Sequence, residues 1–107
     1  MPETNKIQMQ FTHEQKIALM KSLMWDYPIS PEHCLEVLEG TREKAGHYNQ
    51  FTLFRKLIES FPWFTVMRIL TLQRILQLLT DKTIYSLRFK SLQKRYEFIR
   101  SRLQQIV

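Results

Sequence analysis

Hydrophobic side chains recur every three or four positions through most of this chain, which is the spacing of helices that bury one face. The densest stretch is residues 48–79, where Phe51, Phe54 and Phe61 belong to such a series. Five aromatic residues lie within positions 51–64. Because aromatic side chains bury large areas, we expect the core to form around this segment.

Capping residues mark where the first helices begin and end. Thr12 followed by Gln15 matches a capping box and opens a helix. This helix should end near residues 25–27, because Pro28 disfavours helical geometry in the residue before it. Ser30, followed by proline and glutamate, starts a second helix that Gly40 ends.

The later helices follow a polar stretch, residues 41–48, that predicts a loop. Their expected caps are Asn49, Thr71 and Thr80, and a Ser-Phe-Pro sequence at 60–62 separates two of them. The last helix is the clearest, since its apolar positions form a single seam. These positions are Leu92, Tyr96, Ile99, Leu103 and Ile106.

These elements predict an all-α fold, a compact single domain of five to seven short helices over residues 11–107. Residues 1–10 show no periodicity and are expected to form a flexible N-terminal arm. The alternation of Tyr85, Leu87 and Phe89 also fits a short β wing near residues 84–89, as in a winged helix. Both interpretations of that segment stay open.

The composition is that of a globular protein and also bears on its cellular location. The chain has 107 residues, of which 44% are hydrophobic. Its one cysteine, Cys34, cannot form an internal disulfide, and its position in a predicted helix favours burial. Residues 1–10 contain no apolar leader, and the apolar runs fall far short of a bilayer span. We therefore expect a cytoplasmic protein.

Charge is distributed unevenly along the chain. Residues 1–53 hold five Lys and Arg against seven Asp and Glu, whereas residues 54–107 hold eleven against three. The overall formal charge is +6. A basic half of this kind is typical of a nucleic-acid or acidic partner, and equally of helices with solvated outer faces.

Few residues are arranged for catalysis or for holding a cofactor. His13, His33 and His47 fall in separate predicted elements, without the spacing of metal ligands. The sequence has no glycine-rich phosphate loop and no nucleophile elbow. We expect no enzymatic activity and no bound metal or cofactor.

The C-terminal segment is the candidate nucleic-acid-binding region, because its cations and aromatics could contact phosphates and bases. A helical wheel favours a solvated amphipathic helix instead, since the cations are scattered around the apolar seam. The candidate residues are Arg88, Lys90, Lys94, Arg95, Arg100 and Arg102.

Aromatic residues near predicted helix ends are candidates for binding a partner protein, because Trp and Tyr are favoured interface anchors. The alternative is that they only pack or cap at those helix ends. The candidates are Trp25, Asp26, Tyr27, Phe61 and Trp63.

A family resemblance begins at Leu23-Met24-Trp25-Asp26, which is similar to the Leu-Phe/Leu-Trp-Asp signature of a small prokaryotic family of unknown function. Three further segments resemble that family, so that the similarity runs loosely from residue 19 to 103. They are the helix at 53–60, the aromatic-led helix at 63–70 and the basic aromatic end at 95–98. The chain departs from the family's pattern by the long 41–48 loop and by Met24 within the signature.

Members of that family resemble antitoxin-like partners of nucleotidyltransferase-type abortive-infection toxins, and the family offers no catalytic residues. The resemblance implies a non-enzymatic helical module that binds such a toxin. The alternative function is a DNA-binding, winged-helix-like transcriptional regulator that uses the basic C-terminal half.

Overall fold

The computed structural model describes residues 10–106, which form seven helices and one two-stranded hairpin. In chain order, the elements are α2 (His13–Leu23), α3 (Pro31–Glu39), β1 (Lys44–Ala45), β2 (Tyr48–Asn49), α4 (Gln50–Ser60), α5 (Trp63–Ile69), α6 (Leu72–Leu78), α7 (Asp81–Tyr85) and α8 (Lys90–Ile106). The predicted helical fold class is confirmed. Of the expected N-terminal arm, residues 1–9 lie outside the described residues.

The predicted caps form the helix starts. Side-chain oxygens of five residues accept a backbone N–H from the first turn of the following helix; they are Thr12, Ser30, Asn49, Thr71 and Thr80. Thr12 and Gln15 complete the predicted capping box. Gly40 ends α3 in the left-handed conformation, with φ of 95°. The first helix ends at Leu23, two residues before the expected boundary.

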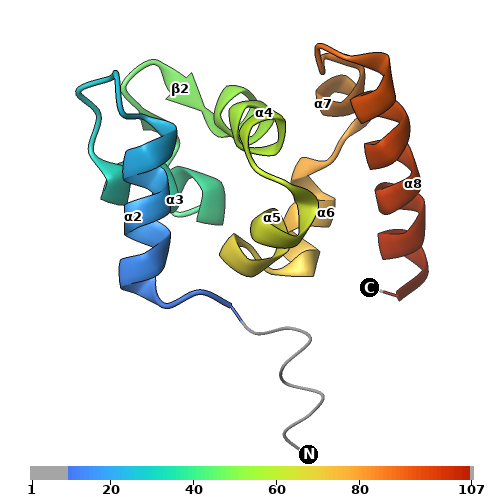
Figure 1. The fold of residues 1–107 in the computed structure, drawn as a ribbon, viewed down its shortest axis with the longest axis horizontal. Helices are drawn as coiled ribbons and strands as arrows, with labels where there is room; N and C mark the ends of the chain where they lie inside the picture. The colour runs from blue at the N-terminus through green and yellow to red at the C-terminus, as the bar shows by residue number, and fades with distance from the viewer. Residues whose placement is uncertain (1–9, 107) are drawn as a thin grey trace, which may run out of the picture.

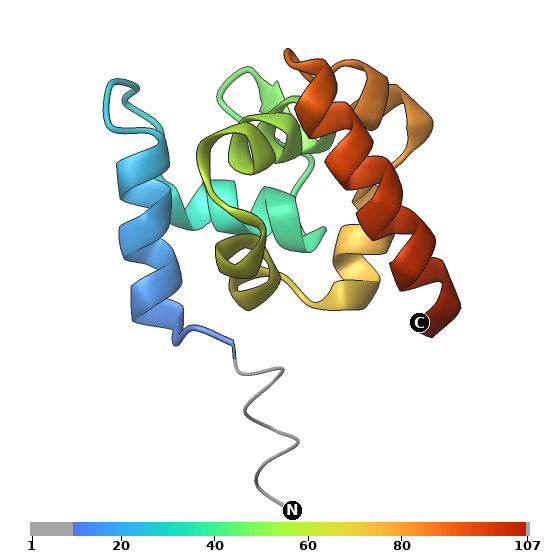
Figure 2. The same cartoon turned by 45° about the vertical axis from the view of Figure 1, so that its right-hand side comes forward.

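The helices surround a core centred on α4. Helices α2 and α3 pack together on one side of the molecule, α8 covers the other, and α4, α5 and α6 lie between them (Figures 1 and 2). Phe54 and Leu57 of α4 are fully buried, together with Met20, Leu38 and Tyr96 from the surrounding helices. Phe51 and Phe61, expected in the same buried series, are only half-buried.

The short β element lies elsewhere than predicted. Residues 84–89 form the end of α7 and a turn into α8, because Thr80 caps α7 and Ser86 N–H closes its last turn. Tyr85 and Phe89 are exposed while Leu87 is buried, which produces the alternation without a strand. The correction is that residues 84–89 form no wing.

The observed strands fall mostly within the predicted 41–48 loop, and β2 extends one residue beyond it. Lys44 pairs with Asn49 and Ala45 with Tyr48 in an antiparallel hairpin. Gly46 occupies the first turn position with φ of 61°, as two-residue hairpin turns with a leading glycine require. The hairpin packs on α3 and α4, away from α8 (Figure 1).

Gln10 and Phe11 pack against α5 before α2 begins. The N–H of Phe11 donates to the Arg68 carbonyl at 2.8 Å, and the Arg68 guanidinium lies 4.1 Å from the centre of the Phe11 ring. The sequence predicted that Gln10 belongs to the flexible arm. Its side-chain amide instead donates to the Met67 carbonyl at 2.8 Å, which attaches Gln10 to the domain. Among residues 10–106, no helix is both long and apolar enough to span a lipid bilayer.

Candidate functional site

The turn between α2 and α3 carries three of the predicted partner-binding residues, Trp25, Asp26 and Tyr27, and all three are exposed. The backbone of this turn is fixed by hydrogen bonds. The N–H of Tyr27 donates to the Met24 carbonyl at 2.9 Å, and the N–H of Ile29 donates to the Tyr27 carbonyl at 2.9 Å. The turn therefore presents its side chains from an ordered backbone.

The hairpin brings two further aromatic rings to this turn. The ring of Tyr27 meets the rings of His47 and Tyr48 edge-on, with centroids 6.2 and 5.7 Å apart, and His47 stacks on Tyr48 at 4.7 Å. The Lys56 ammonium lies 5.7 Å from the centre of the Tyr27 ring. We call Trp25, Tyr27, His47 and Tyr48 the aromatic corner.

The aromatic corner has an ordered base and an exposed rim. Tyr48 is half-buried at the base, and this burial, together with a hydrogen bond to Tyr27, raises the pKa of its phenol to about 12. Trp25, by contrast, is 81% exposed. The sequence did not single out His47 or Tyr48 for binding, because the chain lacks the Asn-Gly or Asp-Gly pair that marks a hairpin.

The other two predicted partner-binding residues lie elsewhere. Phe61 and Trp63 are half-buried and pack against the core at the junction of α4 and α5. The Trp63 ring meets the Tyr96 ring of α8 edge-on, with centroids 6.2 Å apart. The turn that holds Trp25 lies at the opposite side of the molecule from α8 (Figures 1 and 2). The five residues therefore do not form one surface.

Four of the predicted nucleic-acid-binding residues share the solvent-facing side of α8. Lys90, Lys94, Arg95 and Arg102 are exposed, and with Phe98, which is 62% exposed, they form what we call the outward face of α8. Leu92, Tyr96, Ile99 and Leu103 on the opposite side of the helix pack into or against the core. The predicted seam is thus confirmed over these four positions, whereas Ile106 is exposed.

Arg88 and Arg100 do not belong to that face. The Arg100 guanidinium is partly buried and pairs with the Asp81 carboxylate at 2.6 Å, which fastens α8 to α7. The backbone N–H of Arg88 donates to the Glu59 carboxylate at 2.9 Å, which ties the turn before α8 to the end of α4. The Arg100 contact engages its guanidinium, whereas the Arg88 contact uses the backbone alone and leaves an exposed side chain just before α8. Sequence spacing gave no sign of either contact.

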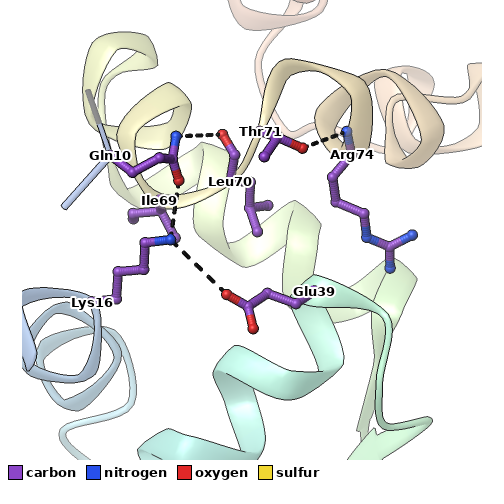
Figure 3. A pocket seen from close by; sticks show the side chains of 7 residues that line it. All are labelled: Gln10, Lys16, Glu39, Ile69, Leu70, Thr71 and Arg74. Atoms are coloured by element: carbon purple, nitrogen blue, oxygen red, sulfur yellow. Dashed lines mark hydrogen bonds and ion pairs between the residues drawn. The ribbon is translucent and has the colours of Figure 1, made fainter. Parts of the chain in front are cut away.

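A cleft of about 220 Å³ opens where α2, α3, α5 and α6 meet (Figure 3). Its polar groups bind one another. The Gln10 side-chain amide donates to the carbonyls of Met67 and Leu70, and its oxygen accepts a 3.0 Å hydrogen bond from Lys16. The Lys16 ammonium also lies 4.0 Å from the Glu39 carboxylate. No residue predicted to bind a partner lines this cleft.

The remaining chemically reactive side chains are separated or buried. Cys34 is fully buried in α3, as predicted, and burial raises the pKa of its thiol. Within residues 10–106, no three His, Cys, Asp or Glu residues lie close enough together to hold a metal ion.

No known protein family, curated protein or solved structure matches this chain.

Proposed function

We propose that this protein is a non-enzymatic binding module that recognises a partner protein through the aromatic corner. The observation that carries this proposal is Trp25, which is 81% exposed on a turn whose backbone is held by hydrogen bonds. Tryptophan is mostly buried in folded proteins, because its large ring loses favourable burial when left in water.

The surroundings of Trp25 support an interface. Tyr27 follows Trp25 by two residues, His47 of the hairpin turn contacts the Tyr27 ring, and both of these residues are exposed. Trp and Tyr dominate the residues that contribute most to protein–protein affinity. The turn backbone is held by hydrogen bonds, and the rings of Tyr27, His47 and Tyr48 contact one another. This part of the surface would therefore lose little conformational freedom when a partner docks.

The resemblance of residues 23–26 to the prokaryotic signature supplies the class of partner. Trp25 and Asp26 of that signature lie on the exposed turn. We propose that the partner is a nucleotidyltransferase-type toxin that this protein restrains in the cytoplasm, as an antitoxin-like protein would.

The second candidate function is a DNA-binding regulator, and the outward face of α8 favours it. Four cations gather there, which suits a phosphate backbone. The β-hairpin, however, packs on α3 and α4 instead of flanking α8 (Figure 1). The support for this candidate is therefore the charge on α8 and not a winged-helix arrangement.

The proposed function is tested by recovering tagged protein from its native host at moderate salt and identifying bound proteins by mass spectrometry. We expect one stoichiometric partner of nucleotidyltransferase type. Trp25→Ala should weaken that complex about thirty-fold, as loss of an interface anchor does. Isothermal titration calorimetry with the purified partner measures the change.

Phe64→Ala is the matched control, because Phe64 is 66% exposed but lies on α5. This variant should bind the partner like the unmodified protein. Recovery of no protein partner, or a complex that tolerates both Trp25→Ala and Tyr27→Ala, would overturn the proposal.

A further inference from the structure

We propose that the outward face of α8 binds single-stranded nucleic acid, with its cations on the phosphates and Phe98 stacked on a base. This inference goes beyond the proposed protein partner and does not depend on it. It concerns a different surface, on the side of the molecule away from the aromatic corner (Figure 2).

The spacing along α8 places the cations in one row. Lys90, Lys94, Phe98 and Arg102 follow one another at intervals of four residues, so each is the neighbour of the next and the row winds gradually around the exposed side of the helix. With a rise of 1.5 Å per residue, the row is roughly 18 Å long. Arg95 is exposed beside it. The row is long enough to contact several successive phosphates.

The charge of this row is only partly offset by the protein's own acids. Two of the three acidic residues of the basic half are engaged away from α8, whereas the third, Glu97, lies on α8 beside Lys94. Glu59 accepts from the Arg88 N–H, Asp81 pairs with Arg100, and Glu97 accepts a 2.8 Å hydrogen bond from the Tyr85 hydroxyl. The outward face of α8 holds four cations against this one neighbouring acid. It is therefore complementary to a polyanion.

The exposed ring of Phe98 indicates which class of polyanion fits this face. Phe98 stands in the middle of the row at 62% exposure, and the Arg102 guanidinium lies 5.8 Å from the centre of its ring. A duplex hides its base faces inside the stack, and an acidic peptide offers none. A single strand offers both phosphates and open base faces, which aromatic rings and arginines bind by stacking.

Two further aromatic side chains extend the surface at the start of α8. Phe89 is 61% exposed and Tyr85 is 59% exposed, and both lie at the corner between α7 and α8. The Tyr85 hydroxyl donates to the Glu97 carboxylate, which favours one orientation of the ring. These rings give further bases a place to stack beyond Lys90.

The experiment measures fluorescence anisotropy of a labelled oligonucleotide of about 15 nucleotides, a length that one small fold covers. The same sequence is tested as a single strand and as a duplex at increasing salt. We expect tighter binding of the single strand. With four phosphate contacts, its affinity should fall about fifty-fold between 50 and 200 mM salt.

Variants separate stacking from charge. Phe98→Ala should weaken single-strand binding about tenfold, in the range measured for base–aromatic stacking. Lys94→Ala with Arg102→Ala should reduce the salt slope by about 1.4. Lys21→Ala with Lys44→Ala is the control, because it removes two exposed cations from α2 and β1. It should leave binding unchanged.

Each contrary result overturns the inference. Absence of binding at 50 mM salt, equal affinity for duplex and single strand, or indifference to Phe98→Ala would do so. Displacement of the oligonucleotide by polyglutamate at matched charge would show a general polyanion surface. A control variant as weak as the α8 variants would show binding through net charge. Circular dichroism checks that each variant is folded.

Discussion

Arg74 shows how one side chain joins distant parts of the fold. Its guanidinium Nε donates to the Leu38 carbonyl at 2.7 Å, at the C-terminal end of α3, where a positive charge is favourable. A second guanidinium nitrogen donates to the Gln77 side chain at 3.0 Å. Burial lowers the pKa of Arg74. The Arg74 guanidinium packs closely against Gly40, which has no side chain in its way.

Gly40→Ala should destabilise the protein by about 1–2 kcal/mol, because Gly40 has φ of 95° and the left-handed region is costly for alanine. An added Cβ would also lie 3.2 Å from the Arg74 guanidinium carbon. Urea denaturation measures the loss. Gly40→Asn is the control, since asparagine tolerates this backbone better and should lose less. An unchanged midpoint for Gly40→Ala would contradict the expectation.

Helix starts could be predicted from the sequence because each depends on residues three or four positions apart. Thr12, Ser30 and Asn49 each accept the N–H of the third residue after them. The hydrogen bond that caps each helix therefore joins residues that are also close in the sequence. The hairpin could not be predicted in this way. It depends on Gly46 fitting beside Ile29, a contact between segments that a sequence pattern does not reveal.

Thr12→Ala should cost about 1 kcal/mol of unfolding free energy, because both hydrogen bonds of its capping box with Gln15 would be weakened or lost. Ser22→Ala in the same helix is the matched control, since Ser22 is exposed and alanine favours helix. Chemical denaturation of both variants tests the difference. Equal stability of the two variants would show that the cap contributes little.

The candidate surfaces were predicted in part, for a related reason. Trp25 to Tyr27 could be placed at a helix end because Pro28 ends the helical pattern locally, whereas their exposure is seen only in the structure. Phe61 and Trp63 looked equivalent to them in the sequence, yet tertiary packing half-buries both. In the sequence, Arg100 likewise could not be distinguished from its basic neighbours, because its ion pair with Asp81 forms only in the folded protein. Long-range contacts decide which side chains remain available.

On the scale of the whole molecule, the two candidate surfaces lie on opposite sides of one core. The aromatic corner is built on the turn between α2 and α3 and on the hairpin, and the other surface is the outward face of α8 (Figures 1 and 2). The rings of Trp63 and Tyr96 link α5 to α8 inside this arrangement. A protein partner and a nucleic acid could therefore bind at the same time without competing for space.

The stability of this core should depend on pH through two tyrosines. Burial raises the pKa of Tyr96 to about 12, and burial with the Tyr27 contact does the same for Tyr48. An unfolded chain ionises tyrosine near pH 10. Between about pH 10 and 12 the unfolded state therefore binds fewer phenol protons than the native state. The contribution of these two tyrosines to the unfolding free energy should therefore be constant below pH 10 and should fall as the pH rises further.

Denaturation in urea at pH 8 and pH 11 measures this fall, and phenolate absorbance reports which tyrosines ionise in the native protein. Tyr96→Phe isolates the effect from other groups that titrate in the same range, because it removes one ionisable phenol while keeping the ring beside Trp63. We expect a smaller loss of stability at pH 11 for this variant than for the unmodified protein. The same loss in both would mean that Tyr96 ionises equally well in the folded core and in water. Its contact with α5 would then have to be loose enough to admit solvent.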